Sequence, residues 1–141
     1  MRYKVFIDAD VVIDFFTDRK PHINASSELF ELNEKGAIIL YLSAVSVNNI
    51  YYIVRKFLGH NKAIAVIEVL TEMTQITGTT KKEILQALKN DFKDFEDSIQ
   101  YSSALTIKDL DVIITRNIKD YKNSKIAVMT PLTFLKMRDK L

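Results

Sequence analysis

Apolar residues along this chain alternate between two kinds of segment. Short apolar runs, typical of parallel strands buried on both faces, lie within residues 3–7, 37–42, 111–115 and 126–129. Residues 75–77 have the length of a short edge strand. Between these runs apolar residues recur at the spacing of one helix face, as in Val47, Ile50, Tyr51, Val54 and Leu58. This order predicts one domain over residues 1–141 with a three-layer α/β/α fold, in which helices cover both faces of a four- or five-stranded parallel sheet.

Capping residues and glycine indicate where the helices begin and end. We expect helices over residues 10–16, 23–35, 43–58, 61–74, 79–88 and 94–107, and a last helix that starts at Pro131. The predicted N-caps of the first three are Asp10, Asn24 or Ser26, and Ser43 or Ser46. Thr80 and Glu83 have the spacing of a capping box, and Gly36 follows the end of the second helix.

The composition excludes several classes of function, mainly because certain residue types and segments are absent from the sequence. The chain has no cysteine, which excludes disulfides, zinc–thiolate sites and thiol nucleophiles and fits a reducing cytosol. No apolar run reaches the ~18 residues of a membrane span, and the first residues lack the pattern of a signal peptide. We therefore expect a cytoplasmic protein without a membrane segment. The net charge of +2 indicates a nucleic-acid partner only weakly.

The sequence contains four polar clusters. Each lies at the end of an apolar segment, at the start of a predicted helix or within one. They are Asp8 with Asp10, Asn48 with Asn49, Asp94 with Asp97, and Asn117 with Asp120. An α/β fold can gather such groups, because ligand sites lie beyond the carboxyl ends of parallel strands. Carboxylates crowded there repel one another unless a hard cation neutralises them, and Mg²⁺ and Mn²⁺ prefer oxygen ligands. The pattern predicts phosphodiester chemistry.

Each cluster also has a purely structural explanation. Asp8 and Asp10 suit turns and caps, and acids in a first helical turn, as at 94–97, are favoured by the helix dipole. The two asparagines at 48–49 suit a hydrogen bond between helices, and Asn117 suits a turn. Glu96 points away from Asp97 on a helical wheel, so we expect it to be solvated.

Four motifs in order carry a family resemblance. They are hhhDxD at 5–10, S-x-x-S-x-x-N-I-Y-Y at 43–52, D-F-x-D-F-E-D-S-I-Q-Y-x-x-A at 91–104, and I-I-T-R-N-x-K-D-Y at 113–121. Together they resemble the PIN-domain family, closest to the bacterial VapC-type toxins. The likeness runs from Val5 to Phe134. It implies a PIN-like fold and a metal-dependent ribonuclease that uses Mg²⁺ or Mn²⁺ to activate water, as the toxin of a toxin–antitoxin pair.

The resemblance also assigns residues and partners. Catalytic roles fall to Asp8, Asp94, Asp97 and Asn117; metal binding to these and Asp120; supporting roles to Asp10, Asn49 and Thr115; RNA contacts to Arg55, Arg116 and Lys119. Two positions depart from the family pattern, because Asn49 stands where Glu is usual and Asn117 where Asp is frequent. The implied partners are RNA, an antitoxin and a second copy of the chain, with an exposed apolar patch expected near Phe57 and Leu58.

Two alternatives remain open from the sequence. The amides at Asn49 and Asn117 favour a degenerate PIN fold that binds RNA or a partner protein without cleaving RNA. The opening Asp8-Ala9-Asp10-Val11-Val12 also resembles the D-x-D-x-V of haloacid-dehalogenase-type phosphatases, with Ser43 as a phosphate ligand. That family requires paired acids directly after a later strand, where this chain has Thr115-Arg116-Asn117.

Overall fold

The structure, a computed structural model, describes residues 2–139 and has a five-stranded parallel sheet at its centre. Its strands are β1 (Tyr3–Ile7), β2 (Ile38–Ser43), β3 (Gln75–Thr77), β4 (Val112–Ile114) and β5 (Ala127–Met129). They lie in the order β3-β2-β1-β4-β5, with every pair parallel. The chain therefore extends the sheet on one side of β1 and then on the other, which creates a topological switch point between β1 and β4.

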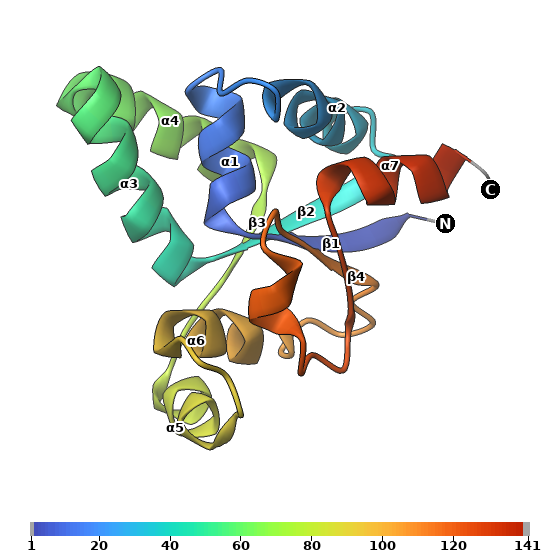
Figure 1. Cartoon of the computed structure of the whole chain (residues 1–141). Helices are drawn as coiled ribbons and strands as arrows, with labels where there is room; N and C mark the ends of the chain where they lie inside the picture. Colours follow the sequence, from blue (N-terminus) through green and yellow to red (C-terminus); the bar gives the residue numbers. More distant parts are fainter. Residues whose placement is uncertain (1, 140–141) are drawn as a thin grey trace.

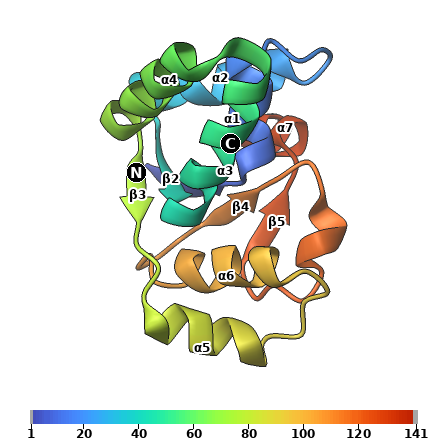
Figure 2. The same cartoon turned by 90° about the vertical axis from the view of Figure 1, so that its left-hand side faces the viewer.

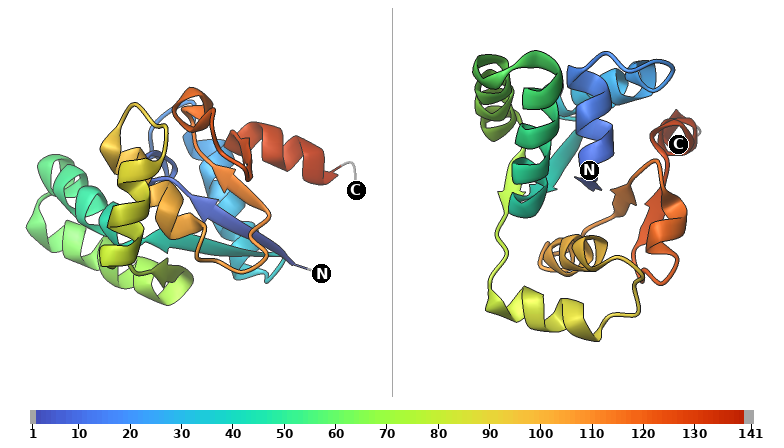
Figure 3. Two further views of the ribbon diagram at one scale, coloured as in Figure 1. Left: turned by 90° about the horizontal axis from the view of Figure 1, so that it is seen from below. Right: turned by 60° about the vertical axis from the view of Figure 1, so that its left-hand side comes forward.

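Helices cover both faces of the sheet, as predicted (Figure 1). One face carries α1 (Ala9–Phe16), α2 (Ile23–Glu34), α3 (Ala44–Leu58), α4 (His60–Met73) and α7 (Pro131–Asp139). The other carries α6 (Phe95–Ala104) and the short 3₁₀ helix η1 (Ile118–Tyr121). Helix α5 (Lys81–Lys89) packs on α6, which lies between α5 and the sheet (Figure 2). The right-hand view in Figure 3 shows the same separation of the two helical layers.

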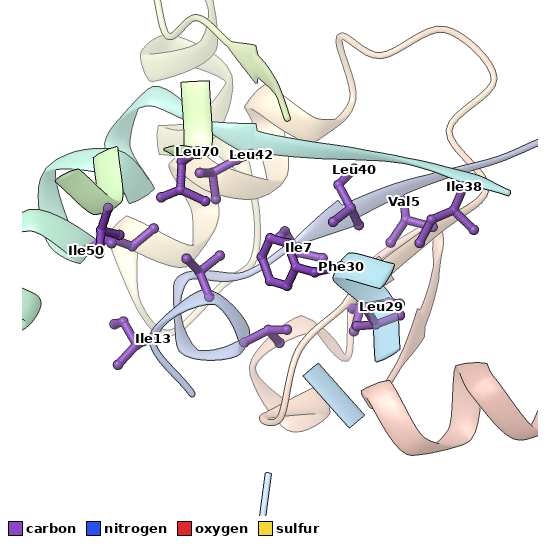
Figure 4. Packing of buried hydrophobic residues seen from close by; sticks show 14 of the residues in the cluster. Val5, Ile7, Ile13, Leu29, Phe30, Ile38, Leu40, Leu42, Ile50 and Leu70 are labelled. Atoms are coloured by element: carbon purple, nitrogen blue, oxygen red, sulfur yellow. The ribbon is translucent and has the colours of Figure 1, made fainter. Parts of the chain in front are cut away.

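Alternation along the central strand builds the two halves of the core. Val5 and Ile7 point into the larger cluster, where they pack with Leu29, Leu40 and other apolar side chains (Figure 4). Phe6 points to the opposite face and packs in a smaller cluster with residues of α6, β4 and η1. All three β1 residues are fully buried. A strand buried on both faces explains why this segment is continuously apolar.

The cap predictions were correct for two helices and wrong for two. Ser43 caps α3 by accepting a hydrogen bond from the Ser46 amide, and Thr80 forms the predicted capping box of α5. For α2 neither Asn24 nor Ser26 is the cap, because the helix already begins at Ile23. For α1 the cap is Asp8, whose carboxylate accepts from the Ala9 amide. Asp10 therefore lies inside the first turn, where its side chain is free to contact other elements.

Two further boundaries differ from the prediction. Helix α6 ends at Ala104 rather than 107, because Thr106 donates to the Ser103 carbonyl and the chain then turns through Asp109, which has φ 59°. Strand β5 is an edge strand with Ala127 exposed, so burial on both faces was wrong for this run. The short strand at 75–77 is confirmed at the opposite edge. Among residues 2–139 we find no helix that is long and apolar enough to cross a membrane.

Leu70 tests how α4 is held to the larger cluster. Its side chain is fully buried, so Leu70→Ala should lower the free energy of unfolding by about 2–5 kcal/mol through lost burial and a residual cavity. The matched control Leu105→Ala, at a side chain 42% exposed, should cost about 1 kcal/mol or less. Urea unfolding followed by circular dichroism measures both, and equal losses would contradict this packing.

Candidate active site

The pairing of β1 with β4 creates the centre of the site. Ile7 lies opposite Ile114, so the residues that leave these strands, Asp8 and Thr115, are neighbours although they are far apart in sequence. The Asp8 amide continues the ladder by donating to the Ile114 carbonyl at 2.9 Å. Both residues therefore stand at the carboxyl edge of the sheet, at its switch point.

Thr115 is the hydrogen-bonding centre of this edge. Its fully buried hydroxyl lies 2.9 Å from Asp8 Oδ2 and 3.4 Å from Asp10 Oδ2, and it accepts a hydrogen bond from the Asn117 amide at 3.1 Å. The Arg116 amide donates to Asp10 Oδ2 at 3.1 Å. The turn after β4 therefore holds the two carboxylates of the first motif in place.

Helix α6 brings a second group of acids to the same edge. Asp94 caps this helix, accepting at Oδ1 from the Asp97 amide at 3.0 Å, as the structural explanation predicted. Asn49 of α3 donates to the Glu96 carboxylate, so the predicted hydrogen bond between helices is confirmed for this asparagine. Glu96 is exposed, as expected, and its carboxylate also accepts this hydrogen bond because α3 packs against α6.

Titration behaviour shows how close these acids are. Burial first, and then the charges of Asp8, Asp94 and Asp120, together raise the pKa of Asp97 to about 7. Burial and then the charge of Asp8 raise the pKa of Asp10 to about 7. Burial also raises the pKa of Asp8, against the opposing hydrogen bonds from Thr115 and Ala9. The edge of the sheet is thus a concentrated anionic region whose carboxylates disfavour one another's ionisation.

Tyr121 is a site residue that sequence reasoning did not single out. Its ring is buried in the smaller cluster, and within the described chain its hydroxyl has no hydrogen-bond partner. Burial, followed by the charges of Asp8 and Asp97, raises the pKa of this hydroxyl. Tyr121 closes the motif at 113–121, and its position directly after Asp120 was the available signal.

Asp14 and Arg116 form a buried ion pair that the sequence analysis also missed. Arg116 Nε lies 2.7 Å from Asp14 Oδ2, and Arg19 approaches the same carboxylate at 3.8 Å. Asp14 is fully buried, and burial raises its pKa against the opposing charges of Arg116, His22 and Arg19. The signal was the i, i+4 spacing of Asp10 and Asp14, which places both on one face of α1.

Three cavities surround the anionic edge. The first, about 420 Å³, is lined by Asp94, Asp97 and Asp120 together with Lys93, Lys119 and Lys122. The second, also about 420 Å³, is lined by Asp10, Asn49, Tyr52, Glu96 and Arg116 among others. The third, about 600 Å³, lies between α2, the turn after β4 and the start of α7, and includes His22, Arg116 and Asn117.

The structure thus gathers most of the predicted site residues and places others at its margin. Asp8, Asp10, Asp94, Asp97, Asp120 and Thr115 share the anionic edge. Asn49 and Asn117 line cavities on its flank, Lys119 lines the first cavity, and Arg55 is exposed in the last turn of α3.

The donor set is chemically suited to a hard cation, since it consists of carboxylate, amide and hydroxyl oxygens. The buried, unpartnered Tyr121 hydroxyl and Asp10 Oδ1 are further oxygen donors. Between residues 2 and 139, however, no three Asp, Glu or His side chains converge closely enough to hold an ion. Ion binding would therefore require the carboxylates to turn toward one another.

Comparisons with known proteins find a family profile and a related protein that each match most of this chain. A sequence profile described as "PIN domain" matches residues 4–119. The chain is 27% identical over 136 residues to "Ribonuclease VapC1" of Aquifex aeolicus (strain VF5), covering 93% of this chain and 92% of that protein.

Two solved structures have a similar fold. A toxin–antitoxin complex from Klebsiella pneumoniae matches with TM-score 0.66 and 18% identity, over 90% of this chain and 97% of that one. VapC20 of Mycobacterium tuberculosis, described as a sarcin–ricin loop cleaving toxin, matches with TM-score 0.63 and 14% identity, over 77% of this chain and 86% of that one. The predicted fold is confirmed.

The raised pKa of Asp97 predicts a loss of stability with rising pH. Its ordinary value is 3.8 and its value in the fold is about 7, so between these the folded chain holds a proton that the unfolded chain has released. Without divalent cations, the unfolding free energy should be highest near pH 4 and fall as the pH rises to about 7.

Asp97→Asn should make this decline shallower, whereas the control Asp109→Asn, in the exposed turn after α6, should keep the wild-type profile. Thermal unfolding at a series of pH values measures the slopes. Parallel curves for wild type and Asp97→Asn would show that this carboxyl is not crowded by its neighbours.

Thr115 allows a matched pair of substitutions. Thr115→Val removes the hydroxyl that donates to Asp8 and accepts from the Asn117 amide, and it should cost about 1–3 kcal/mol of unfolding free energy. Thr115→Ser keeps the hydroxyl and loses only a methyl group, so its cost should be smaller. Chemical denaturation compares the two, and a larger loss for serine would contradict the role of the hydroxyl.

Proposed function

This chain is a VapC-like member of the PIN-domain family, and we propose that it is a ribonuclease that uses a divalent cation at the anionic edge of its sheet. The observation that carries the proposal is the electrostatic repulsion among the acids at this edge, since the charge of Asp120 raises the pKa of both Asp8 and Asp97 and the charge of Asp8 raises the pKa of Asp97. The likeness to a curated ribonuclease over nearly the whole chain supports it. Family membership favours this function over the phosphatase alternative.

We assign Asp8 and Asp97 as the main ligands of Mg²⁺ or Mn²⁺, with Asp94, Asp120 and Asn117 as further ligands. The cation would supply a more acidic bound water and neutralise charge on the phosphate. Thr115 and Asp10 support the site, because the Thr115 hydroxyl orients Asp8 and the Arg116 amide orients Asp10.

The Glu96 carboxylate lies next to Asn49, one of the two positions where this chain has an amide instead of the usual acid. Asn49 has no charge, but its side chain donates to the Glu96 carboxylate, which therefore stands beside the position where relatives carry an acid. Burial and the charges of Asp94 and Asp8 raise the pKa of Glu96, so it belongs electrostatically to the anionic edge. We propose that Glu96 supplies the negative charge that Asn49 lacks.

Basic side chains flank the acids and suit an RNA backbone. Lys119 lines the first cavity with the acids, and Arg116 lines the second and third. Arg55 is further along α3 and would contact RNA only beyond the cavities. Lys and Arg contacts to phosphate give affinity without sequence preference.

We further propose an antitoxin partner and a homodimer. Structural relatives include a toxin–antitoxin complex. The expected apolar patch on α3 is exposed, with Phe57 60% and Tyr52 59% accessible, and Tyr52 also lines the second cavity. An apolar partner segment on α3 would therefore reach the edge of the site.

Binding without cleavage is the second candidate, favoured by the amides at 49 and 117 and by the absence, within residues 2–139, of a preformed three-ligand site. It predicts RNA affinity that is independent of divalent cations and of Asp8. The cleavage experiment below separates the two functions.

Substitution of the two main ligands tests the ribonuclease. Asp8→Asn and Asp97→Asn should each reduce Mn²⁺-dependent RNA cleavage by at least about 100-fold, because even residues behind a metal ligand are worth roughly 10–100-fold. Cleavage of a structured RNA and calorimetric Mn²⁺ titration measure activity and affinity.

The control is Asp109→Asn, an equivalent change in the turn before β4, at the opposite end of the strands from the site. It should cleave like wild type. Equal activity in all four proteins would exclude the assignment, and RNA binding without any cleavage would favour the second candidate.

A further inference from the structure

The third cavity adjoins the anionic edge, and of the residues that line it only Asn117 has a role in the proposed cation chemistry. It measures about 600 Å³, within the roughly 300–1,000 Å³ range of small-molecule sites. Its walls come from the start of α2, the turn after β4 and the start of α7. These elements are distant in sequence, so the cavity exists only in the folded chain.

Arg116 connects this cavity to the site. Its side chain lines both the second and the third cavity, so it forms the boundary between them. Arg116 Nε lies 2.7 Å from Oδ2 of the fully buried Asp14, and Arg116 Nη1 lies 3.5 Å from His22 Nε2. The guanidinium is therefore fixed in direction, while 26% of its side chain remains accessible. A positioned guanidinium with free N–H groups is a good phosphate ligand.

The lining of the cavity combines an apolar wall with polar groups. Leu132 at the start of α7 provides apolar surface, since it is 56% exposed, whereas Pro131 before it is buried. Asn24 and Asn117 also line the cavity, and within the described chain neither side-chain amide forms a hydrogen bond. Such amides can both donate to and accept from the edge of a base.

We propose that the third cavity is a ribonucleotide subsite for the RNA substrate. Arg116 binds the phosphate, Leu132 packs against the base, and the amide of Asn24 hydrogen-bonds to its edge. Unpaired bases of RNA are typically recognised by such a combination of packing and edge contacts. This subsite rests on the proposed ribonuclease function, since it would hold a nucleotide next to the bond presented to Asp8 and Asp97.

Titration with nucleotides tests the subsite without requiring cleavage. We expect adenosine and uridine 5′-monophosphate, added without divalent cations, to shift the backbone NMR signals of Asn24, Arg116 and Leu132. Inorganic phosphate at the same concentration should shift the Arg116 signal but not that of Leu132. Equal effects of phosphate and nucleotides, or nucleotide shifts confined to the first cavity, would overturn the proposal.

Leu132→Asp tests the same subsite in the full reaction. It places a negative charge on the apolar wall and should raise KM for a single-stranded RNA about tenfold, with kcat within about twofold of wild type. The control Leu105→Asp makes the same change at an exposed leucine of the turn after α6 and should leave both constants unchanged. Circular dichroism verifies that both variants are folded.

The outcomes separate the two proposals. If wild type cleaves RNA and Leu132→Asp has an unchanged KM, the subsite is wrong and the ribonuclease stands. If wild type does not cleave RNA, the ribonuclease fails, and the nucleotide titration of wild type and Leu132→Asp decides the subsite by itself. Unchanged nucleotide affinity in Leu132→Asp would then overturn it.

Discussion

The register between β1 and β4 is the constraint on which the site depends. It places Asp8 beside Thr115. The buried Thr115 hydroxyl can then donate a hydrogen bond to the Asp8 carboxylate and accept one from the Asn117 backbone amide. Asp10 and the Arg116 amide then add a second link between the same two chain segments. A shift of one residue in this pairing would turn the side chains to the opposite faces and separate these groups.

The same edge collects negative charge at a cost to stability. Asp97 and Asp10 have strongly raised pKa values because they are partly buried beside other acids. Natural proteins concentrate such destabilising groups where a ligand uses them. One helical turn further along α1, Asp14 pairs with Arg116, whose charge and backbone amide also lower the pKa of Asp10 and so offset part of the repulsion.

Helix contacts across the switch point decide which side chains join the site. Glu96 is exposed, as the helical wheel predicted, but the approach of α3 to α6 also brings Asn49 within hydrogen-bonding distance of it. Tyr121 follows Asp120 in η1 and has its side chain buried in the smaller cluster. Both residues depend on the packing of α6 and η1 against the sheet, which local spacing does not specify.

Hydrophobic periodicity was sufficient to predict the parallel sheet, its two helical layers and nearly every element, because strand and helix periods are local properties of the chain. Family motifs singled out the acids that the fold brings to the carboxyl edge of the sheet. The predicted N-caps of α1 and α2, the end of α6 and the burial of β5 on both faces were wrong. The exposure of β5 follows from its place at the edge of the sheet, which strand order decides and local sequence does not. Only tertiary structure decided that Asn117 lines the third cavity, that Asp14 holds Arg116 and that Glu96 stands beside Asn49. Each of these contacts joins segments brought together by strand order and helix packing, which no single stretch of sequence encodes.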